Sequence, residues 1–104
     1  MGSHREWLLE EYGPVCAYCG RDFPAEVMTL DHVRPRKGKT AYDRPDNLVF
    51  ACRECNASKA DTPLMSFLLA RRSRAVFLLE YGEHLSEPLQ ELAKQIAHRP
   101  LLGE

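Results

Sequence analysis

Four cysteines, arranged in two Cys-x-x-Cys pairs, are the residues of this sequence whose spacing most directly predicts chemistry. The pairs are Cys16 with Cys19 and Cys52 with Cys55, and they include every cysteine of the chain. Each pair suits a tight turn that directs two thiolates at one point, and four thiolates complete the tetrahedral shell of structural Zn²⁺. The alternatives are disulfides, which are disfavoured in an intracellular chain, and a redox site, which needs only one such pair. We therefore expect a structural zinc site whose Cys→Ser variants unfold.

Thirty-two residues separate Cys19 from Cys52. This separation exceeds the roughly 15–20 residues of an ordinary zinc ribbon and indicates an insert between the two turns. The insert contains the motifs Asp-His-x-x-Pro (31–35) and Asp-Asn-Leu-Val (46–49), and the second cysteine pair continues as Asn-x-x-Lys (56–59). In this order the motifs resemble the zinc-knuckle branch of the HNH endonuclease family over residues 16–59. The resemblance implies a ββα-metal core, with Asp31 and His32 on the first strand and Asn56 on the helix.

Asp31, His32 and Asn56 also have the chemistry that phosphodiester hydrolysis needs, namely a base for water and ligands for a positive centre. His32 is the predicted base, because the unperturbed pKa of histidine is about 6.5 and neutral imidazole is abundant at physiological pH. Asp31 and Asn56 offer hard oxygen atoms, which favour Mg²⁺ or Mn²⁺ and leave coordination positions for water and a phosphate. Regular strand alternation would send Asp31 and His32 to opposite faces, so we expect a strand end or a bulge near Pro35 to re-aim one of them.

The resemblance further implies a role for Asn47, the middle residue of the motif. Its side-chain amide is expected to bond the loop backbone and hold His32 in place, and so to serve the catalytic site. An ordinary Asx turn is the alternative interpretation, and the two are not exclusive. The last position of the family motif is often His, so Asn56 predicts weaker metal binding. His84 and His98, which lack matching partners, are interpreted as surface or packing residues.

Basic residues concentrate in the middle third of the chain, although the formal net charge is -1. Residues 31–59 carry seven basic and four acidic side chains, whereas residues 1–30 carry two and five, and residues 60–104 carry five and six. Local clusters of Lys and Arg meet phosphate backbones, although a solvated charge run is the alternative. The predicted DNA-binding residues are Arg34, Arg36, Lys37, Lys39, Arg53 and Lys59.

Hydrophobic periodicity and turn-forming residues predict short elements around these motifs. We expect a helix over 6–12, strands over 27–33 and 48–51, and a helix over 52–60. Thr62 as N-cap with Pro63 predicts a helix toward Tyr81, and Ser86 begins a last helix that ends near residue 99. The predicted fold class is α+β: a small ββα-metal (His-Me finger) core with a four-cysteine zinc knuckle, an N-terminal helix and a C-terminal helical pair.

The 104 residues, 44% of them hydrophobic and 28% charged, predict one domain over residues 5–104. The core is placed at 15–60 and the C-terminal helices at 62–99, and residues 1–4 are interpreted as the remnant of a tag. No stretch approaches the roughly 18 apolar residues of a membrane span. The start also lacks the apolar segment of a signal peptide, so an intracellular, cytoplasmic protein without a membrane partner is expected.

The leading hypothesis is a metal-dependent HNH endonuclease that hydrolyses DNA and nicks one strand per active site. Its cofactors would be structural Zn²⁺ and catalytic Mg²⁺ or Mn²⁺. Double-strand cleavage would need two sequential events or a homodimer, for which the C-terminal helices are the candidate surface. The first alternative is a non-catalytic zinc-ribbon module that binds DNA, and the second is a structural zinc domain that joins protein partners. Divalent-dependent plasmid cleavage that His32→Ala abolishes would distinguish the enzyme from both alternatives.

Overall fold

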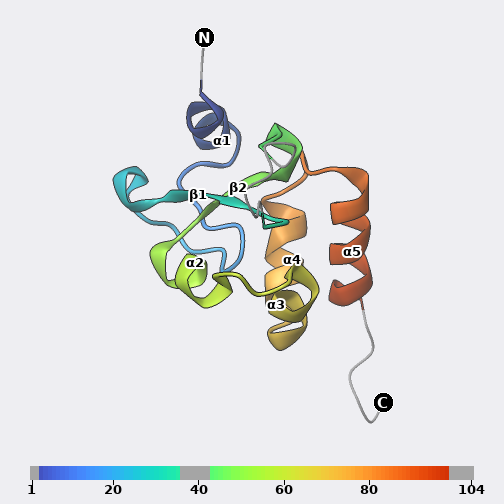
Figure 1. The fold of residues 1–104 in the computed structure, drawn as a ribbon. Helices are drawn as coiled ribbons and strands as arrows, with labels where there is room; N and C mark the ends of the chain where they lie inside the picture. Colours follow the sequence, from blue (N-terminus) through green and yellow to red (C-terminus); the bar gives the residue numbers. More distant parts are fainter. Residues whose placement is uncertain (1–2, 36–42, 99–104) are drawn as a thin grey trace.

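A two-stranded antiparallel sheet lies at the centre of the molecule (Figure 1). The computed structural model describes residues 3–35 and 43–98. Strand β1 (Thr29–His32) pairs with β2 (Leu48–Ala51), and Asp31 lies opposite Val49. The other elements are α1 (His4–Tyr12), the 3₁₀ turns η1 (Ala25–Val27) and η3 (Pro45–Asn47), α2 (Arg53–Lys59), α3 (Leu64–Ala70), α4 (Ser73–Glu80) and α5 (Glu87–Ala97). The predicted α+β class with a ββα core is confirmed.

Strand β2 is the most buried segment of this core, because all four of its residues are buried. An unbroken apolar run of this kind is typical of a strand that is covered on both faces. The backbone N–H of Ala17 donates to the carbonyl of Phe50 at 2.9 Å, so the first cysteine turn is also bonded to β2. The hairpin and the first cysteine turn are thus held together as one unit.

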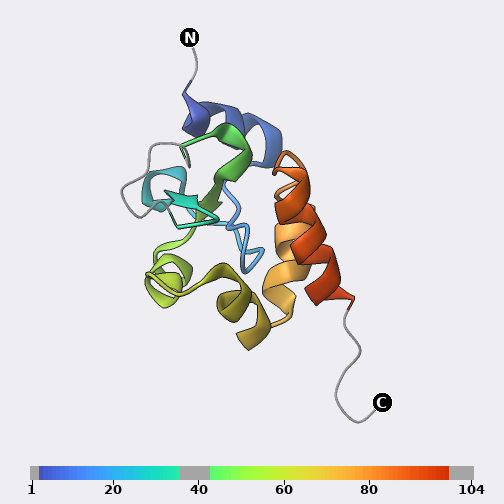
Figure 2. The same ribbon diagram turned by 45° about the vertical axis from the view of Figure 1, so that its right-hand side comes forward.

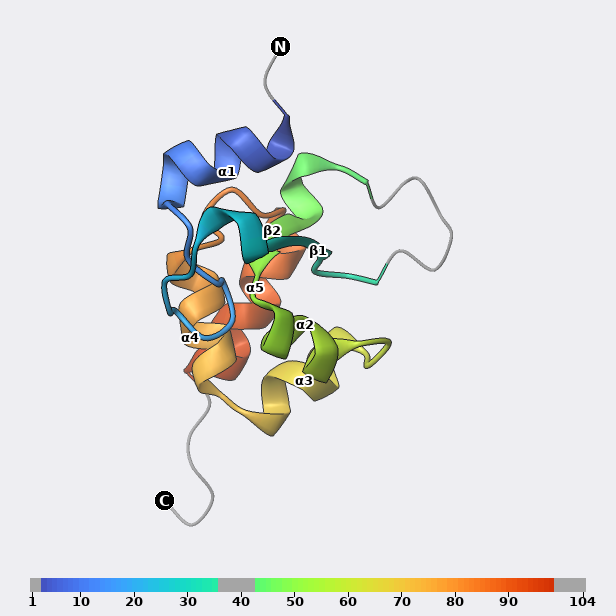
Figure 3. The same cartoon turned by 90° about the vertical axis from the view of Figure 1, so that its left-hand side faces the viewer.

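Helix α1 begins two residues earlier than predicted. Ser3 is its N-cap, because the Ser3 Oγ accepts a hydrogen bond from the backbone N–H of Glu6 at 3.1 Å. Ser3 and His4 therefore belong to the start of this helix. Gly13 ends the helix with φ 78, a conformation that glycine adopts readily. Figures 2 and 3 show α1 at one end of the molecule and α3 at the other, with the hairpin between them.

The described C-terminal part, residues 64–98, contains three helices, so the predicted helical pair is wrong in number. The single helix expected from Pro63 to Tyr81 breaks at Arg71, which is extended at φ -149 and ψ 100. Arg74 stabilises the break, because its Nη1 donates to the Phe67 carbonyl at 2.9 Å and its guanidinium lies 3.9 Å from the centre of the Phe67 ring. The break lets α3 and α4 direct separate apolar faces at the core.

Helices α4 and α5 lie side by side and bury their apolar faces, as Figures 1 and 2 show. The buried residues include Ala75, Leu78, Leu89, Ala93 and Ile96. Because these faces are used within the chain, the predicted pairing of two chains through these helices gains no support. None of the helices in the described part of the chain is long and apolar enough to cross a membrane.

The loop between α4 and α5 docks onto the hairpin through His84. The His84 Nε2 donates to the Leu48 carbonyl at 2.7 Å, and its Nδ1 lies 2.8 Å from the Tyr12 hydroxyl. The backbone N–H of Ser86 donates to the Asp46 carbonyl at 3.0 Å. His84 therefore has the packing role that the sequence predicted.

Candidate active site

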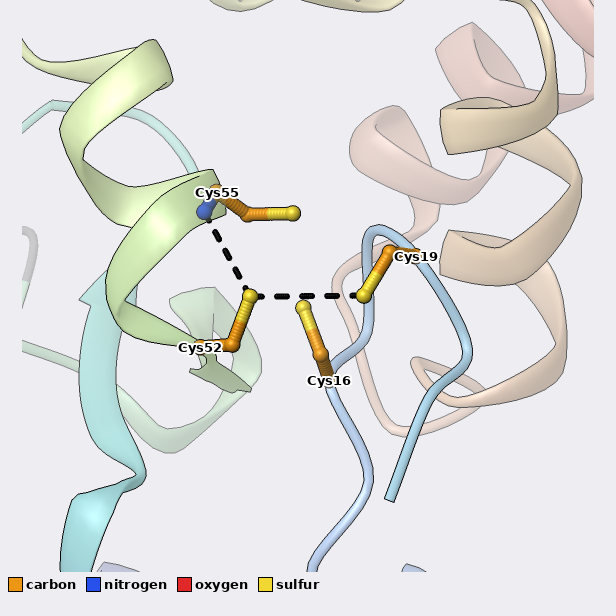
Figure 4. A group of neighbouring side chains, drawn as sticks. All are labelled: Cys16, Cys19, Cys52 and Cys55. Carbon is orange, nitrogen blue, oxygen red and sulfur yellow. Dashed lines mark hydrogen bonds between the residues drawn. The ribbon is translucent and has the colours of Figure 1, made fainter. Parts of the chain in front are cut away.

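The four cysteine sulfurs converge on one point from two segments of the chain (Figure 4). Cys16 and Cys19 lie in the turn after α1, Cys52 and Cys55 lie at the start of α2, and all four sulfurs are within 4.8 Å of one another. Tetrahedral Zn–S bonds of about 2.3 Å place the sulfurs roughly 3.8 Å apart. The sulfurs of Cys19 and Cys52 lie 4.0 Å apart, and all four cysteines are free. The cluster therefore fits structural Zn²⁺ and contains no disulfide.

Burial makes two of these thiols resist ionisation. It raises the pKa of Cys16 to about 11 and raises the pKa of Cys55 as well. Burial would also raise the pKa of Cys19, but hydrogen bonds from the side chain and backbone of Arg21 help to lower it. Arg21 Nε donates to the Cys19 sulfur at 3.4 Å. A divalent cation at the centre of the cluster would supply the positive charge that the buried thiolates lack.

Helix α4 covers the first cysteine turn. Gly20 in this turn has φ +70, and a Cβ there would lie 2.6 Å from the ring of Phe77, so both conformation and space require glycine. A cavity of about 330 Å³ beside the cluster is lined by charged residues of the turn, of α2 and of the α3–α4 connection, namely Arg21, Glu54, Arg71 and Arg74. Four thiolates around Zn²⁺ carry net negative charge, which these arginines partly offset. No role was predicted for these arginines from the sequence.

Strand β1 and helix α2 face each other through two polar pairs. Thr29 and Asp31 are two residues apart and share one face of the strand, while Asn56 and Lys59 are three apart on the helix. Asn56 Nδ2 donates to Thr29 Oγ1 at 2.9 Å, and Lys59 Nζ lies 3.2 Å from Asp31 Oδ2. The structure therefore brings the two predicted cation ligands, Asp31 and Asn56, to the same strand–helix junction.

Thr29 determines how the Asn56 side chain is oriented. Its hydroxyl donates its one proton to the Ala51 carbonyl at 3.0 Å, so it can only accept from Asn56. The amide of Asn56 consequently turns its NH₂ toward Thr29 and leaves its oxygen available to a cation. Thr29 was not predicted as a site residue, although its place two residues before Asp31 on the same strand face was a usable signal.

Asp31 is enclosed by two donors. Its side chain is 10% exposed, and Oδ2 accepts from the Tyr18 hydroxyl at 2.6 Å and from Lys59. Burial and the nearby charge of Asp31 raise the pKa of Tyr18 well above its ordinary value, so Tyr18 remains a protonated donor. Tyr18 was not predicted as a functional residue, because nothing in a Cys-x-x-Cys turn indicates a contact with a distant strand.

Lys59 is buried, which argues against its predicted contact with DNA. Its side chain is 2% exposed, and its amino group is taken up by Asp31 and by the His32 carbonyl, to which it donates at 2.8 Å. A buried ammonium of this kind is retained because it is paired, and it cannot reach a phosphate outside the protein.

His32 is the last residue of β1 and pairs with Leu48, so the expected re-aiming of one of the two neighbouring side chains stays a prediction. The His32 side chain is 30% exposed, and its Nε2 lies 2.7 Å from Asp43 Oδ1. A carboxylate partner favours the proton on Nε2, which leaves the lone pair of Nδ1 for a base. Within residues 3–35 and 43–98, no hydrogen bond joins the His32 ring to Asp31 or Asn56. Asp43 was not predicted as a site residue, since this pairing depends on how the chain returns to the hairpin.

Asn47 closes the hairpin just beyond His32. Its Oδ1 accepts from the backbone N–H of Arg34 at 2.9 Å, and its Nδ2 donates to the Arg34 carbonyl at 3.2 Å. The backbone N–H of Val33 also donates to the Asn47 carbonyl at 2.8 Å. These contacts have the geometry that the resemblance implied, and the effect of Asn47 on catalysis stays a prediction.

Two of the predicted DNA-binding residues, Arg34 and Arg53, are exposed. Arg36, Lys37 and Lys39 lie outside the described residues. A larger apolar cavity of about 430 Å³ lies between α1 and η3, and none of the predicted site residues lines it. The chemistry of the site is therefore concentrated at the junction of β1 and α2, beside the cysteine cluster.

Known proteins are similar to the part of the chain that forms this site. The HNH endonuclease family model matches residues 16–62. The CRISPR-associated endonuclease Cas9 of Actinomyces naeslundii is 42% identical over 55 residues, which are 53% of this chain and 5% of that protein. The Cas9 of Corynebacterium diphtheriae is 42% identical over 48 residues, which are 46% of this chain and 4% of that protein. The chain thus spans about a twentieth of the length of these curated relatives.

The similarity in fold extends beyond the matched residues to the flanking helices. The crystal structure of the Type II-C Cas9 enzyme from Actinomyces naeslundii matches with a TM-score of 0.61 at 26% identity, and the match covers 94% of this chain and 13% of that chain. The residues matched by the family model include both cysteine pairs, the hairpin and α2. Residues 16–62 therefore form a domain of the HNH endonuclease family.

Proposed function

We propose that this domain is a divalent-metal-dependent endonuclease that hydrolyses DNA phosphodiester bonds and holds a structural Zn²⁺ in its cysteine cluster. The observation that carries the proposal is the meeting of Asp31 and Asn56 at the β1–α2 junction, next to His32 at the strand end. Carboxylate and amide oxygens suit Mg²⁺ or Mn²⁺, whereas four sulfurs suit zinc, so the two donor sets select different ions. The endonuclease relatives support the activity.

In the proposed reaction, His32 Nδ1 takes a proton from a water molecule. The water oxygen attacks phosphorus and the bond to O3′ breaks, which leaves a 5′ phosphate and a 3′ hydroxyl that is protonated from solvent. Asp43 holds the Nε2 proton of His32 and stabilises the imidazolium that forms. Asp31 and Asn56 would hold the Mg²⁺ or Mn²⁺, which supplies positive charge for the transition state and the departing oxygen.

The exposed arginines Arg34 and Arg53, together with basic residues 36, 37 and 39, are the proposed contacts to the phosphate backbone. One active site cleaves one DNA strand at a time, so a single chain is proposed to nick duplex DNA. A cytoplasmic location is proposed as well, because reducing conditions keep the four thiols available to zinc.

Supercoiled plasmid incubated with zinc-loaded protein and Mg²⁺ or Mn²⁺ tests this function. We expect open circles before linear product, and a rate that falls about 10²- to 10⁴-fold in His32→Ala. His98→Ala, which changes an exposed histidine beyond α5, is the matched control and should cut like wild type. A folded His32→Ala variant that cuts at the wild-type rate would show that His32 is not the base. A wild-type protein that binds plasmid without cutting it would favour the zinc-ribbon binding module.

A further inference from the structure

We propose that Tyr18 is a positioning residue for the cation site, because its hydroxyl, together with Lys59, fixes the carboxylate of Asp31. The inference rests on the proposed function, which places Mg²⁺ or Mn²⁺ between Asp31 and Asn56. Tyr18 lies between two cysteines of the zinc cluster, so the proposal also joins the zinc cluster to the ligand of the second metal.

Both donors hold the same oxygen of Asp31. The Tyr18 hydroxyl lies 2.6 Å and Lys59 Nζ 3.2 Å from Oδ2. In the described part of the chain, no hydrogen bond or ion pair engages the other oxygen, Oδ1. Two bonds to one oxygen fix the plane of a carboxylate and therefore the direction in which its second oxygen points. Oδ1 is thus the atom left for a cation, at the same strand–helix junction as Asn56, whose amide oxygen makes no hydrogen bond within the described residues.

The Tyr18 ring is fixed by its packing, so its hydroxyl can hold Asp31 in one position. The residue is buried, and its ring meets the ring of Phe67 edge-on at a centroid distance of 5.1 Å. Its backbone N–H donates to the Cys16 sulfur at 3.4 Å. A movement of the first cysteine turn would therefore displace the hydroxyl that holds Asp31.

The second donor also comes from a segment that binds the cysteine cluster. Lys59 lies one helical turn after Cys55 on α2, and its amino group reaches both the Asp31 carboxylate and the His32 carbonyl. Each half of the cysteine cluster thus sends one donor to Asp31. Zinc binding, which fixes both segments, would therefore orient the carboxylate of Asp31 before a catalytic cation binds.

Tyr18→Phe removes one hydroxyl without a change of charge and keeps the ring. Tyr12→Phe is the matched control, because the Tyr12 hydroxyl bonds His84 and has no contact with Asp31. The affinity for Mn²⁺ is measured on zinc-loaded protein with the full sequence by electron paramagnetic resonance of the free ion, at a temperature where zinc content and circular dichroism show every variant to be folded.

We expect Tyr18→Phe to bind Mn²⁺ about 3- to 10-fold more weakly, since the cation must then immobilise the Asp31 side chain itself. Tyr12→Phe should bind like wild type. In plasmid cleavage, Tyr18→Phe should need more Mn²⁺ for half its maximal rate and recover most of the wild-type rate at saturation. This separation distinguishes positioning from a general loss of structure.

Asn56→Ala, which leaves the Asp31–Lys59 pair intact, separates failure of this inference from failure of the proposed function. If wild type and Asn56→Ala bind Mn²⁺ equally, the proposed cation site itself is wrong. If Asn56→Ala weakens binding and Tyr18→Phe does not, the positioning role is overturned and the proposed function stands. Equal weakening by Tyr18→Phe and Tyr12→Phe would indicate general loosening and would also overturn it.

Discussion

Replacing Lys59 with methionine tests the buried ion pair on which the site is built. Methionine keeps an unbranched apolar side chain and removes the ammonium, which lies 3.2 Å from Asp31 Oδ2 and 2.8 Å from the His32 carbonyl. The two charged side chains are 2% and 10% exposed. The Lys59→Met variant therefore leaves a carboxylate in nearly dry surroundings, with the Tyr18 hydroxyl as its remaining donor.

The expected loss of stability follows from the contact distance and the burial. Two unit charges at 3.2 Å interact by about 5 kcal/mol at an effective dielectric constant of roughly 20. Removal of one partner from a buried pair typically costs about 3–5 kcal/mol. The bond to the His32 carbonyl adds about 1 kcal/mol, and the Tyr18 hydroxyl offsets part of the total. We expect Lys59→Met to lower the free energy of unfolding by about 3–4 kcal/mol and Tm by roughly 12 °C or more.

Urea unfolding of zinc-loaded wild type, Lys59→Met, Asp31→Asn and the double variant measures the coupling between the two side chains. The double variant removes both charges and should regain at least half of the stability that Lys59→Met loses. Lys94→Met changes an exposed lysine on α5 and is the control, expected to stay within about 0.5 kcal/mol of wild type. A Lys59→Met loss below about 1 kcal/mol, or an equal loss in the Asp31→Asn background, would refute the buried pair.

Three other perturbations test the zinc cluster, the base and the hairpin. Chelation of zinc should unfold the domain, because structural zinc contributes roughly 10 kcal/mol or more of folding free energy; an unchanged far-ultraviolet circular dichroism spectrum after chelation would contradict this. Asp43→Asn should slow plasmid cleavage about 10-fold or more without weakening Mn²⁺ binding, since it weakens the partner of the base; an unchanged rate would remove Asp43 from the mechanism. Asn47→Ala should lower the free energy of unfolding by about 1–3 kcal/mol in urea titrations, because both backbone groups of Arg34 lose a partner; a neutral result would mean that water replaces the amide.

The sequence predicted the parts of the fold that depend on local spacing. Two Cys-x-x-Cys pairs allow few arrangements other than a shared metal site, and the four sulfurs do converge. The strand over 48–51 was placed correctly because an apolar run stands between a turn-forming Asn47 and the N-cap residue of α2, Cys52. The assignment of Asp31 and Asn56 to one junction followed from the motif order and agrees with their placement.

The contacts that orient the site could not be predicted in the same way. The pairs Tyr18–Asp31 and His32–Asp43 join side chains whose separation depends on the packing of the whole domain. Lys59 was predicted to contact DNA because it belongs to the basic middle third of the chain, although its position four residues after Cys55 on α2 placed it on the core-facing side. The break between α3 and α4 contains no glycine or proline, so periodicity alone did not reveal it.

The side-chain and backbone hydrogen bonds of Asn47 to Arg34 and Val33 join the two sides of the hairpin just beyond the last residue of β1. The register of β1 with β2 is then set by this closure. Substitutions among residues 36–42 should therefore leave the strand register unchanged, whereas the contact of Asp43 with His32, which depends on how the chain returns to the hairpin, can change.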